Sequence, residues 1–321
     1  MLIQSFLFII GFYILIKGAN ILINGSASLA KIFNVSPWVI GLVIVGIGTS
    51  IPELSITMAS LWQEADLGLG VIVGSNTFNI LVILGIVSLI SPVVMKKVWV
   101  KQDFVFNVLT LGGATWLAFY PVLGDPAFVG ITLEEGVLLL IMFGVWLWYM
   151  LYRRRGIDMV DEDEESGYRT LTLSLSIIMI IAGIVGVFVG GHWVVTGGLA
   201  LAGVLGLSSG LVGLTIVGIG TSLPELTVSV AAIYRRQGSI AVGNIIGSAI
   251  FDFLAIFGVA ALFTPLTFST DLQFDILITF VAAILLLGAM FVGRRYILTR
   301  WQGFLFLVVY LVYLFYILYR G

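Results

Sequence analysis

The sequence contains no cysteine, a single histidine and few charged residues, which make up 10% of its 321 positions. Without cysteine there is no disulfide, no thiolate metal site and no cysteine nucleophile. Soluble proteins carry roughly 25% charged residues. A chain that is 60% hydrophobic and 10% charged is therefore expected to be an integral membrane protein. Its net charge of −2 says little about partners, because most of the surface would face lipid, and nothing indicates nucleic-acid binding.

The apolar runs predict ten membrane-spanning helices, since a span needs about 20 mostly apolar residues. The first run reads as a span and not as a cleaved signal peptide, because it has no basic start and no small-residue cleavage site. One polar connection, residues 152–170, divides the chain into two five-helix halves, residues 1–151 and 171–321. The predicted spans are 2–23, 37–61, 67–90, 104–121, 129–151, 171–200, 209–233, 240–263, 273–292 and 301–319.

The distribution of lysine and arginine predicts the orientation, because cytoplasmic loops carry an excess of both. With both termini outside, 13 basic residues fall on the inner side, only Arg320 falls outside, and Lys17 lies within the first span near its inner end. The expected location is the plasma membrane, with loop 152–170 in the cytoplasm. The inner set is Lys31, Lys96, Lys97, Lys101, Arg153, Arg154, Arg155, Arg169, Arg235, Arg236, Arg294, Arg295 and Arg300.

A nine-residue block occurs twice, as GIGTSIPEL at 46–54 and GIGTSLPEL at 218–226. Over residues 39–54 and 211–226, 12 of 16 positions are identical. A second block follows each copy, GVIVGSNTFN at 70–79 and GNIIGSAIFD at 243–252. Because each half has an odd number of spans, the two halves would cross the membrane in opposite directions. Inverted repeats of this kind are typical of secondary transporters, whose sites lie near the midplane.

Three acidic residues, Glu53, Glu225 and Asp252, lie deep within predicted spans. A charge at the bilayer centre costs about 2.5–3.5 kcal/mol even on the mildest scale. No intramembrane Lys or Arg stands ready to pair with them, so protonation, hydration or a bound cation must neutralise them. Pro52 and Pro224 have no N–H and clash with the carbonyl four residues earlier. We therefore expect broken second and seventh helices whose freed backbone oxygens lie beside the carboxylates.

Further oxygen-bearing side chains share helix faces with these acids. Thr49 and Ser50 precede Glu53, and the second half repeats the arrangement with Thr221, Ser222 and Glu225. In the partner blocks Ser75 and Asn79, like Ser248 and Asp252, are four residues apart and line one face. Oxygen ligands suit Ca²⁺, and hydroxyl and carbonyl groups also suit Na⁺. The one histidine, His192, is interpreted as a packing or gating residue.

The paired Gly-Thr-Ser-x-Pro-Glu blocks, each followed by a helix containing Gly-Ser, resemble the two α-repeats of the cation/calcium exchanger superfamily. The branch resembles the sodium/calcium exchangers and their prokaryotic relatives, and the resemblance covers essentially the whole chain. It implies that Ca²⁺ is held by Glu53, Glu225 and the carbonyls of Thr49 and Thr221. It also implies flanking Na⁺ sites at Ser50, Ser75, Ser222 and Ser248, which share the two glutamates. Asn79 and Asp252 would close the central cluster.

The resemblance implies a fold and a function together. The fold is an all-α integral membrane protein of ten helices in two inverted repeats, with broken second, third, seventh and eighth helices forming the site. The function is Na⁺/Ca²⁺ antiport by alternating access, normally extruding Ca²⁺, without enzymatic activity or a cofactor, and as a monomer in the bilayer. Coupling to H⁺ or K⁺ stays open, and a cation channel is a remoter alternative. Val71, where the second half has Asn244, departs from the usual Gly-Asn pair.

Overall fold

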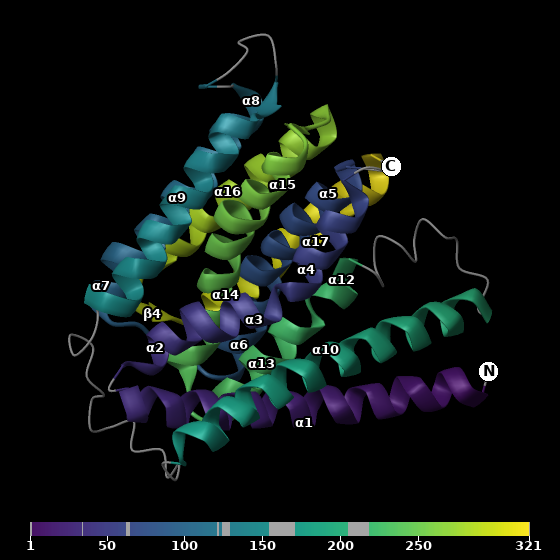
Figure 1. Ribbon diagram of the computed structural model, residues 1–321, viewed down its shortest axis with the longest axis vertical. Coiled ribbons are helices and arrows are strands. Elements are labelled where there is room, and N and C mark those ends of the chain that lie inside the picture. The colour runs from purple at the N-terminus through teal and green to yellow at the C-terminus, as the bar shows by residue number, and fades with distance from the viewer. Residues whose placement is uncertain are drawn as a thin grey trace. The chain divides into compact units, whose positions relative to one another are not determined.

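The computed structural model describes residues 2–33, 35–61, 65–120, 122–123, 129–153, 171–204 and 218–320. These residues form helices, with four two-residue strands (Figure 1). They fall into two compact units, each of which takes residues from both halves of the sequence. Unit 1 comprises residues 1–52 and 154–244, and unit 2 comprises residues 53–153 and 245–321. Most of the predicted linker, 154–170, and the start of the predicted seventh span, 209–217, lie outside the described residues.

Unit 1 is built on two long helices, α1 (Leu2–Phe33) and α10 (Leu173–Val204), which run antiparallel against each other (Figure 1). Glycine makes this contact close. A Cβ on Gly18 would lie 2.6 Å from the backbone nitrogen of Val187, and one on Gly183 would lie 2.6 Å from that of Leu22. Small residues that let backbones approach are a common device of helix pairs in membranes. Any larger side chain here would force α1 and α10 apart.

The rest of unit 1 carries the first and second copies of the duplicated block. Ser36 caps the start of α2 by accepting from the backbone N–H of Val39 at 3.4 Å. Helix α14 crosses the α2–η1 segment closely, since a Cβ on Gly41 would lie 2.9 Å from Ile240 Cα. The elements are α2 (Pro37–Ile40), the π-helical segment η1 (Gly41–Val45), α3 (Gly46–Thr49), α12 (Gly218–Thr221), α13 (Leu223–Tyr234) and the first half of α14 (Gly238–Ile250).

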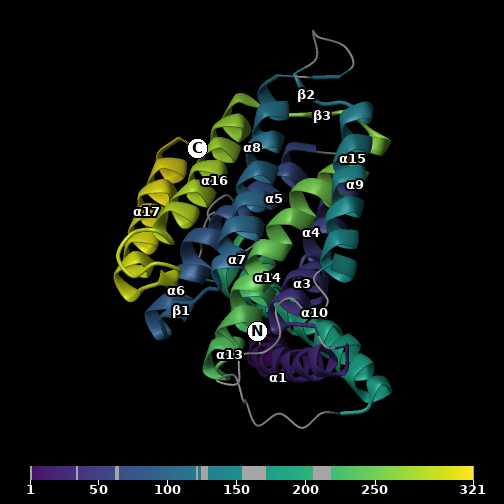
Figure 2. The ribbon, with the colours of Figure 1, turned by 90° about the vertical axis from the view of Figure 1, so that its left-hand side faces the viewer.

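Unit 2 contains most of the remaining described helices and the four described strands (Figure 2). Its helices are α4 (Ile51–Ser60), α5 (Ala65–Phe78), α6 (Leu84–Ile90), α7 (Lys97–Trp99), α8 (Val105–Phe119), α9 (Leu133–Trp148), α15 (Phe257–Phe263), α16 (Thr270–Ala289) and α17 (Arg300–Arg320). Its π-helical segments are η2 (Asn79–Ile83), η3 (Val100–Phe104), η4 (Tyr149–Arg153) and η7 (Phe251–Ile256), and its strands are β1 (Val93–Val94), β2 (Gly130–Ile131), β3 (Leu266–Thr267) and β4 (Ile297–Leu298).

The contacts of unit 2 occur in matched pairs that join the two halves of the sequence. Strand β1 pairs antiparallel with β4, and β3 pairs antiparallel with β2. Helix α6 packs on α17, and α15 packs on α9. Glycines allow both helix contacts, because a Cβ on Gly85 would lie 3.1 Å from the carbonyl oxygen of Gly303 and one on Gly258 would lie 3.0 Å from that of Gly136. In each of these four contacts, an element of the first half of the sequence packs on or pairs with an element of the second half.

Eight helices of the described chain are long and apolar enough to cross a membrane. This agrees with a multi-pass membrane protein. They coincide broadly with eight of the ten predicted spans, and the apolar helix Leu223–Tyr234 represents the described part of another. The remaining predicted span, 104–121, corresponds to a helix that begins earlier, at Lys97, and includes the charged residues Lys101 and Asp103.

The predicted helix breaks are confirmed in two spans and wrong in two others. Helix α3 ends at Thr49 and α4 begins at Ile51, with Ser50 between them, and Ser222 likewise separates α12 from α13. The third and eighth spans are not broken. They run continuously through the π-helical segments η2 and η7, which begin at Asn79 and at Phe251. Proline forces the first two interruptions, whereas the other two spans lack proline and need only a local π turn, a feature frequent at functional sites.

Candidate functional site

The two interruptions in unit 1 have the same backbone geometry. Ser50 has φ −85° and ψ 6°, and Ser222 has φ −89° and ψ 2°. These values lie in the bridge region, which is sparsely populated and where many active-site residues sit. In each copy the proline follows two residues later and the glutamate three residues later. The duplicated sequence therefore gives a duplicated local structure.

The serine side chains at the two breaks are buried and unsatisfied. Ser50 is 1% exposed and Ser222 is 0% exposed. Neither Oγ atom has a hydrogen-bond partner among the described residues. A buried polar group left without a partner costs about 1–3 kcal/mol. Two buried hydroxyls without a hydrogen-bond partner in the described chain thus occur at equivalent positions of the duplicated block.

Thr49 connects the end of α3 to helix α14 within unit 1. Its hydroxyl oxygen Oγ1 lies 3.1 Å from the carbonyl oxygen of Val45 and 3.0 Å from Oδ1 of Asn244. Asn244 in turn donates from Nδ2 to Ser229 Oγ at 3.1 Å and to the main-chain carbonyl of Glu225 at 3.4 Å. Because one amide contacts all three segments, it fixes the α3 terminus relative to α13 and α14.

Both glutamates of the duplicated blocks are deeply buried at helix starts. Glu225 in unit 1 is 0% exposed and lies in the first turn of α13, and Glu53 in unit 2 is 1% exposed and lies in the first turn of α4. The N-terminal end of a helix carries partial positive charge and stabilises a carboxylate there. Each break thus places a buried carboxyl group in the first turn of the helix that follows it.

Unit 2 holds a second group of buried polar side chains. Asn79 begins η2 and Asp252 lies in η7, at matching positions of the two halves. Asn76 donates from Nδ2 to Asp252 Oδ2 at 2.7 Å and to the carbonyl oxygen of Ile72 at 2.8 Å. Asn79 Oδ1 has no hydrogen-bond partner in the described part of the chain. The remaining predicted residues of this group, Ser75 and Ser248, are 2% and 0% exposed.

The structure divides the predicted site residues between the units and adds two asparagines. Unit 1 contains Thr49, Ser50, Pro52, Thr221, Ser222, Pro224 and Glu225, and unit 2 contains Glu53, Ser75, Asn79, Ser248 and Asp252. Asn76 and Asn244 were not predicted as site residues. The sequence feature that could have identified both asparagines is a difference between the two halves. Asn76 is aligned with Ala249, and Asn244 is aligned with Val71.

Helix α10 covers the two breaks in unit 1. Ile184, Val187 and Phe188 line a narrow space together with Pro52 and Pro224. A Cβ on Gly48 would lie 2.7 Å from Ile184 Cδ1, and one on Gly191 would lie 3.7 Å from Pro224 Cγ. The apolar side of α10 therefore packs directly on the segments that carry the unsatisfied hydroxyls. His192, on the same helix, is exposed and takes no part in this contact.

Most of the side-chain oxygens that could act as cation ligands at these positions are neutral. In neither unit, within the described ranges, do three or more His, Cys, Asp or Glu side chains gather as a metal site. Hydroxyl, amide and carboxylate oxygens are hard ligands that suit Na⁺ and Ca²⁺, whereas softer metals prefer nitrogen or sulfur.

Together these features define an all-α, multi-pass membrane protein with duplicated, buried oxygen clusters in its spans. The family model described as "Sodium/calcium exchanger protein" matches residues 3–152 and 175–319. The chain belongs to the sodium/calcium exchanger family.

Several relatives are similar over nearly their full length. Sodium/calcium exchanger MaX1 of Methanosarcina acetivorans is 31% identical over 351 residues, which cover 96% of this chain and 97% of MaX1. Putative antiporter CaxA of Alkalimonas amylolytica is 32% identical over 271 residues, covering 83% of this chain and 82% of CaxA. A solved structure of the sodium-calcium exchanger NCX_Mj, soaked with zero Na⁺ and Ca²⁺, superposes with a TM-score of 0.83 at 30% identity and covers 97% of this chain and 98% of that one.

Proposed function

We propose that the protein is a secondary antiporter that exchanges Na⁺ for Ca²⁺ across the membrane by alternating access, normally extruding Ca²⁺. The observation that carries the proposal is the repeated break at Ser50 and Ser222, each with a buried, unsatisfied hydroxyl followed by a buried glutamate. The names of MaX1 and NCX_Mj agree with this activity. The ions are substrates, and the proposed working form is a monomer without a cofactor.

The proposed Ca²⁺ ligands are Glu53 and Glu225 with the carbonyl oxygens of Thr49 and Thr221. The proposed Na⁺ ligands are the hydroxyls of Ser50, Ser75, Ser222 and Ser248, which share the same two glutamates. Asn79 and Asp252 complete the central cluster. Support comes from burial, since every one of these side chains is at most 9% exposed. Asn76 and Asn244 act as positioning residues, because each fixes a proposed ligand or its helix by hydrogen bonds.

We also propose that residues 1–151 and 171–321 form two inverted five-helix repeats joined by linker 152–170. The matched contacts of unit 2 support this arrangement. A two-fold relation between the halves would exchange the β1–β4 pair with the β3–β2 pair, and the α6–α17 contact with the α15–α9 contact. The proposed location is the plasma membrane. The proposed orientation places both termini outside the cell and the linker in the cytoplasm.

The proposed driving force is the Na⁺ gradient together with the membrane potential. Each net charge that crosses gains about 2.3 kcal/mol per 100 mV. If more Na⁺ charge enters than Ca²⁺ charge leaves, a negative interior drives Ca²⁺ out. The proposed gate is the α1–α10 pair, because α10 packs on both proline breaks in unit 1.

The test is Na⁺-gradient-driven ⁴⁵Ca²⁺ uptake into vesicles containing the full chain. Ser50→Ala and Ser222→Ala should each raise the Na⁺ concentration for half-maximal exchange by roughly tenfold, the equivalent of about 1.4 kcal/mol. Neither should lower thermal stability, because the hydroxyls make no hydrogen bond within the described chain. Glu53→Gln and Glu225→Gln should abolish exchange.

Ser176→Ala is the matched control. Ser176 is also 0% exposed, but its hydroxyl lies 2.9 Å from Ser28 Oγ and 3.0 Å from the carbonyl oxygen of Thr172. This variant should lose stability and keep wild-type ion dependence. Exchange that both glutamine variants retained would refute the site. Ca²⁺ uptake driven by a proton gradient without Na⁺ would identify H⁺ as the coupling ion. A requirement for K⁺ would show that K⁺ is transported together with Na⁺ and Ca²⁺. Steady current without countertransport would support a channel.

A further inference from the structure

The loop that joins α16 to α17 in unit 2, residues 290–299, presents a basic surface. Its strand β4 pairs with β1, and the backbone N–H of Met95 extends this pairing by donating to the carbonyl oxygen of Tyr296 at 2.7 Å. Two lysines follow Met95 and two arginines precede Tyr296, so the antiparallel pairing places the four near one another. No residue of this group belongs to the proposed ion sites. The basic surface comprises Lys96, Lys97, Arg294 and Arg295.

The loop that carries the two arginines is held in one conformation. Gln302 is 1% exposed and donates from Nε2 to the carbonyl oxygens of Ala289 at 2.7 Å and Val292 at 3.1 Å. The backbone N–H of Tyr296 closes the loop on the carbonyl oxygen of Met290 at 2.8 Å. Tyr296 has φ 63°, a left-handed conformation that is an outlier for a bulky residue. Strained backbone of this kind clusters at functional sites and ligand clamps.

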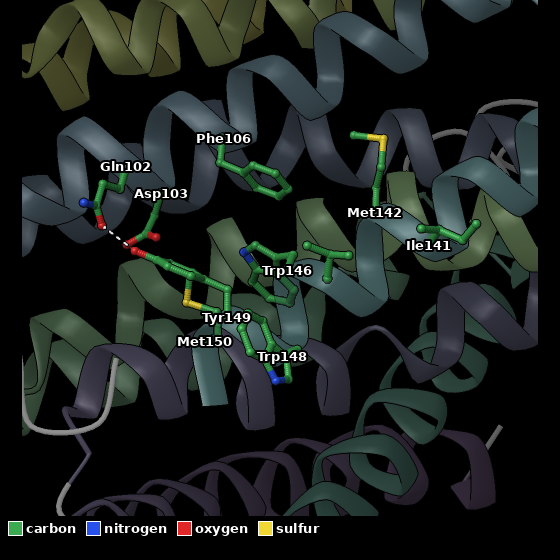
Figure 3. Close-up of a pocket in the computed structure, with 10 residues that line it drawn as sticks. Gln102, Asp103, Phe106, Ile141, Met142, Trp146, Trp148, Tyr149 and Met150 are labelled. Carbon is green, nitrogen blue, oxygen red and sulfur yellow. Dashed lines mark hydrogen bonds between the residues drawn. The ribbon is translucent and has the colours of Figure 1, made fainter. Parts of the chain in front are cut away.

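The helix that follows the two lysines is also held in place. The Nζ atom of Lys96 lies 5.5 Å from the centre of the Trp99 ring, within the range of a cation–π contact. One turn further along, Gln102 Oε1 accepts from the hydroxyl of Tyr149 at 3.2 Å, the bond that is dashed in Figure 3. This bond connects the helix that begins at Lys97 to η4. Lys97 itself is exposed, as are both arginines of the basic surface.

Positive charge dominates the surroundings of the basic surface. Lys101, one turn after Lys97, and Arg300 are exposed, and Arg300 donates to the carbonyl oxygen of Ile90 at 3.3 Å. Asp103, on the same helix as the lysines, is 1% exposed and offsets at most one of these six positive charges. The other acids of unit 2 with described side chains belong to the proposed ion sites or lie within the first two turns of α9 and α16, whose opposite ends adjoin the surface. They are Glu53, Asp252, Glu134, Glu135, Asp271 and Asp275.

Apolar side chains are exposed next to these charges. Phe291 and Val292 in the loop are 47% and 54% exposed, and Val94 in β1 is 69% exposed. The loop joins two candidate spans, Thr270–Ala289 and Arg300–Tyr319. Trp301, in the first turn of the second, is 52% exposed, and tryptophan near the end of a span marks the headgroup level. Exposed apolar groups beside positive charge suit a bilayer surface with anionic headgroups. A soluble anion would use only the charges.

We propose that the basic surface binds the headgroup of an anionic phospholipid. The lipid phosphate is held by Lys97, Arg294 and Arg295, while Phe291 and Val292 enter the boundary between headgroups and acyl chains. Arginine suits this role because its planar guanidinium donates to two phosphate oxygens at once. Like charges that face each other across paired strands are destabilising, and a bound anion removes that repulsion. The zwitterionic phospholipids fit less well, because their ammonium group brings a further positive charge to the surface.

The test is native mass spectrometry of the detergent-purified full chain, titrated with phosphatidylglycerol, phosphatidylethanolamine and phosphatidylcholine of identical acyl chains. Wild-type protein should bind phosphatidylglycerol at least about tenfold more tightly than the other two. Arg294→Gln and Arg295→Gln should each weaken phosphatidylglycerol binding by roughly fivefold, the usual contribution of one basic residue at an anionic membrane surface. Neither should change the affinity for phosphatidylcholine. Arg295→Lys, which keeps the charge, should retain most of the preference.

Arg236→Gln is the matched control, because Arg236 is also exposed and also lies in a turn after a helix, but follows α13 in unit 1. Its lipid affinities should equal those of the wild type. Equal wild-type affinities for the three lipids would overturn the proposal. So would an Arg236→Gln variant that binds like Arg295→Gln, since the charge effect would then not be local.

A soluble competitor separates a lipid site from a site for a small anion. Glycerol phosphate, which carries the same phosphate without acyl chains, should not displace phosphatidylglycerol at equal concentration. Displacement with equal potency would overturn the proposal, because the exposed apolar side chains would then contribute nothing. Lipid binding is measured without transport, so the outcome is independent of the proposed exchange activity.

Discussion

Asn244→Val tests whether a single amide holds the interior of unit 1 together. Valine is the residue at the matching position 71 of the first half, so the change makes the two halves alike. The asparagine side chain contacts Thr49 Oγ1 at 3.0 Å, Ser229 Oγ at 3.1 Å and the carbonyl oxygen of Glu225 at 3.4 Å. All three contacts disappear in the variant, while the side-chain volume stays similar.

The expected loss follows from the two shorter contacts. Interhelical hydrogen bonds within membranes average about 0.6 kcal/mol, so two of them contribute about 1.2 kcal/mol and the 3.4 Å contact adds little. Neither hydroxyl is left without a hydrogen-bond partner in the variant. Thr49 still donates to the carbonyl oxygen of Val45, and Ser229 still donates to the carbonyl oxygen of Ala241 at 3.2 Å. The free energy of unfolding should therefore fall by about 1.2 kcal/mol, or about eightfold in the unfolding equilibrium constant.

The measurement is reversible unfolding in mixed micelles with increasing denaturing detergent, together with the Ca²⁺ concentration for half-maximal uptake. The latter should rise, since Thr49 loses its connection to α14 and is a proposed ligand through its carbonyl. Asn107→Val is the control, because Asn107 is 1% exposed and its Oδ1 has no hydrogen-bond partner among the described residues. An Asn244→Val protein as stable as wild type, or one that behaves like Asn107→Val, would refute the reasoning.

Two further variants probe packing and capping. Gly183→Ala should destabilise the protein by about 1–3 kcal/mol, the usual cost of overpacking, because its Cβ would lie 2.6 Å from the backbone nitrogen of Leu22. Gly113→Ala on α8 should be neutral or stabilising in the same thermal assay, since nothing lies within 4 Å of that Cβ; equal losses would contradict the packing argument. Glu135→Gln should lower stability by about 1–3 kcal/mol, because this buried carboxylate accepts from three backbone N–H groups at 2.6–3.1 Å. Its exchange kinetics should be unchanged, and altered Ca²⁺ dependence would show that Glu135 reaches the transport site.

Local rules predicted the features that depend on neighbours in sequence. The interruptions at Ser50 and Ser222 follow from prolines two residues later, and the duplicated geometry follows from the duplicated block. The breaks expected in the third and eighth spans were wrong, because these spans lack proline and keep their backbone N–H groups. A single π turn accommodates the polar residues in these two spans without a break.

Partners far apart in sequence could not be predicted from spacing. Asn76 donates to Asp252, which lies 176 positions away in the sequence. The predicted span 104–121 stops short of Asp103, whereas the helix starts at Lys97 and the Asp103 side chain is only 1% exposed. Such residues become visible only when tertiary contacts are known.

The strand and helix pairs of unit 2 that join the two halves of the sequence also constrain the order in which the chain can fold during synthesis. Strand β1 at Val93–Val94 has its partner at Ile297–Leu298, and α6 packs on α17, the last helix of the chain. During synthesis these surfaces of the first half stay uncovered until residues 297–320 have emerged. A gene fragment encoding one half alone would yield a product with open edges, which only the other half, or a second copy inserted in the opposite direction, could close.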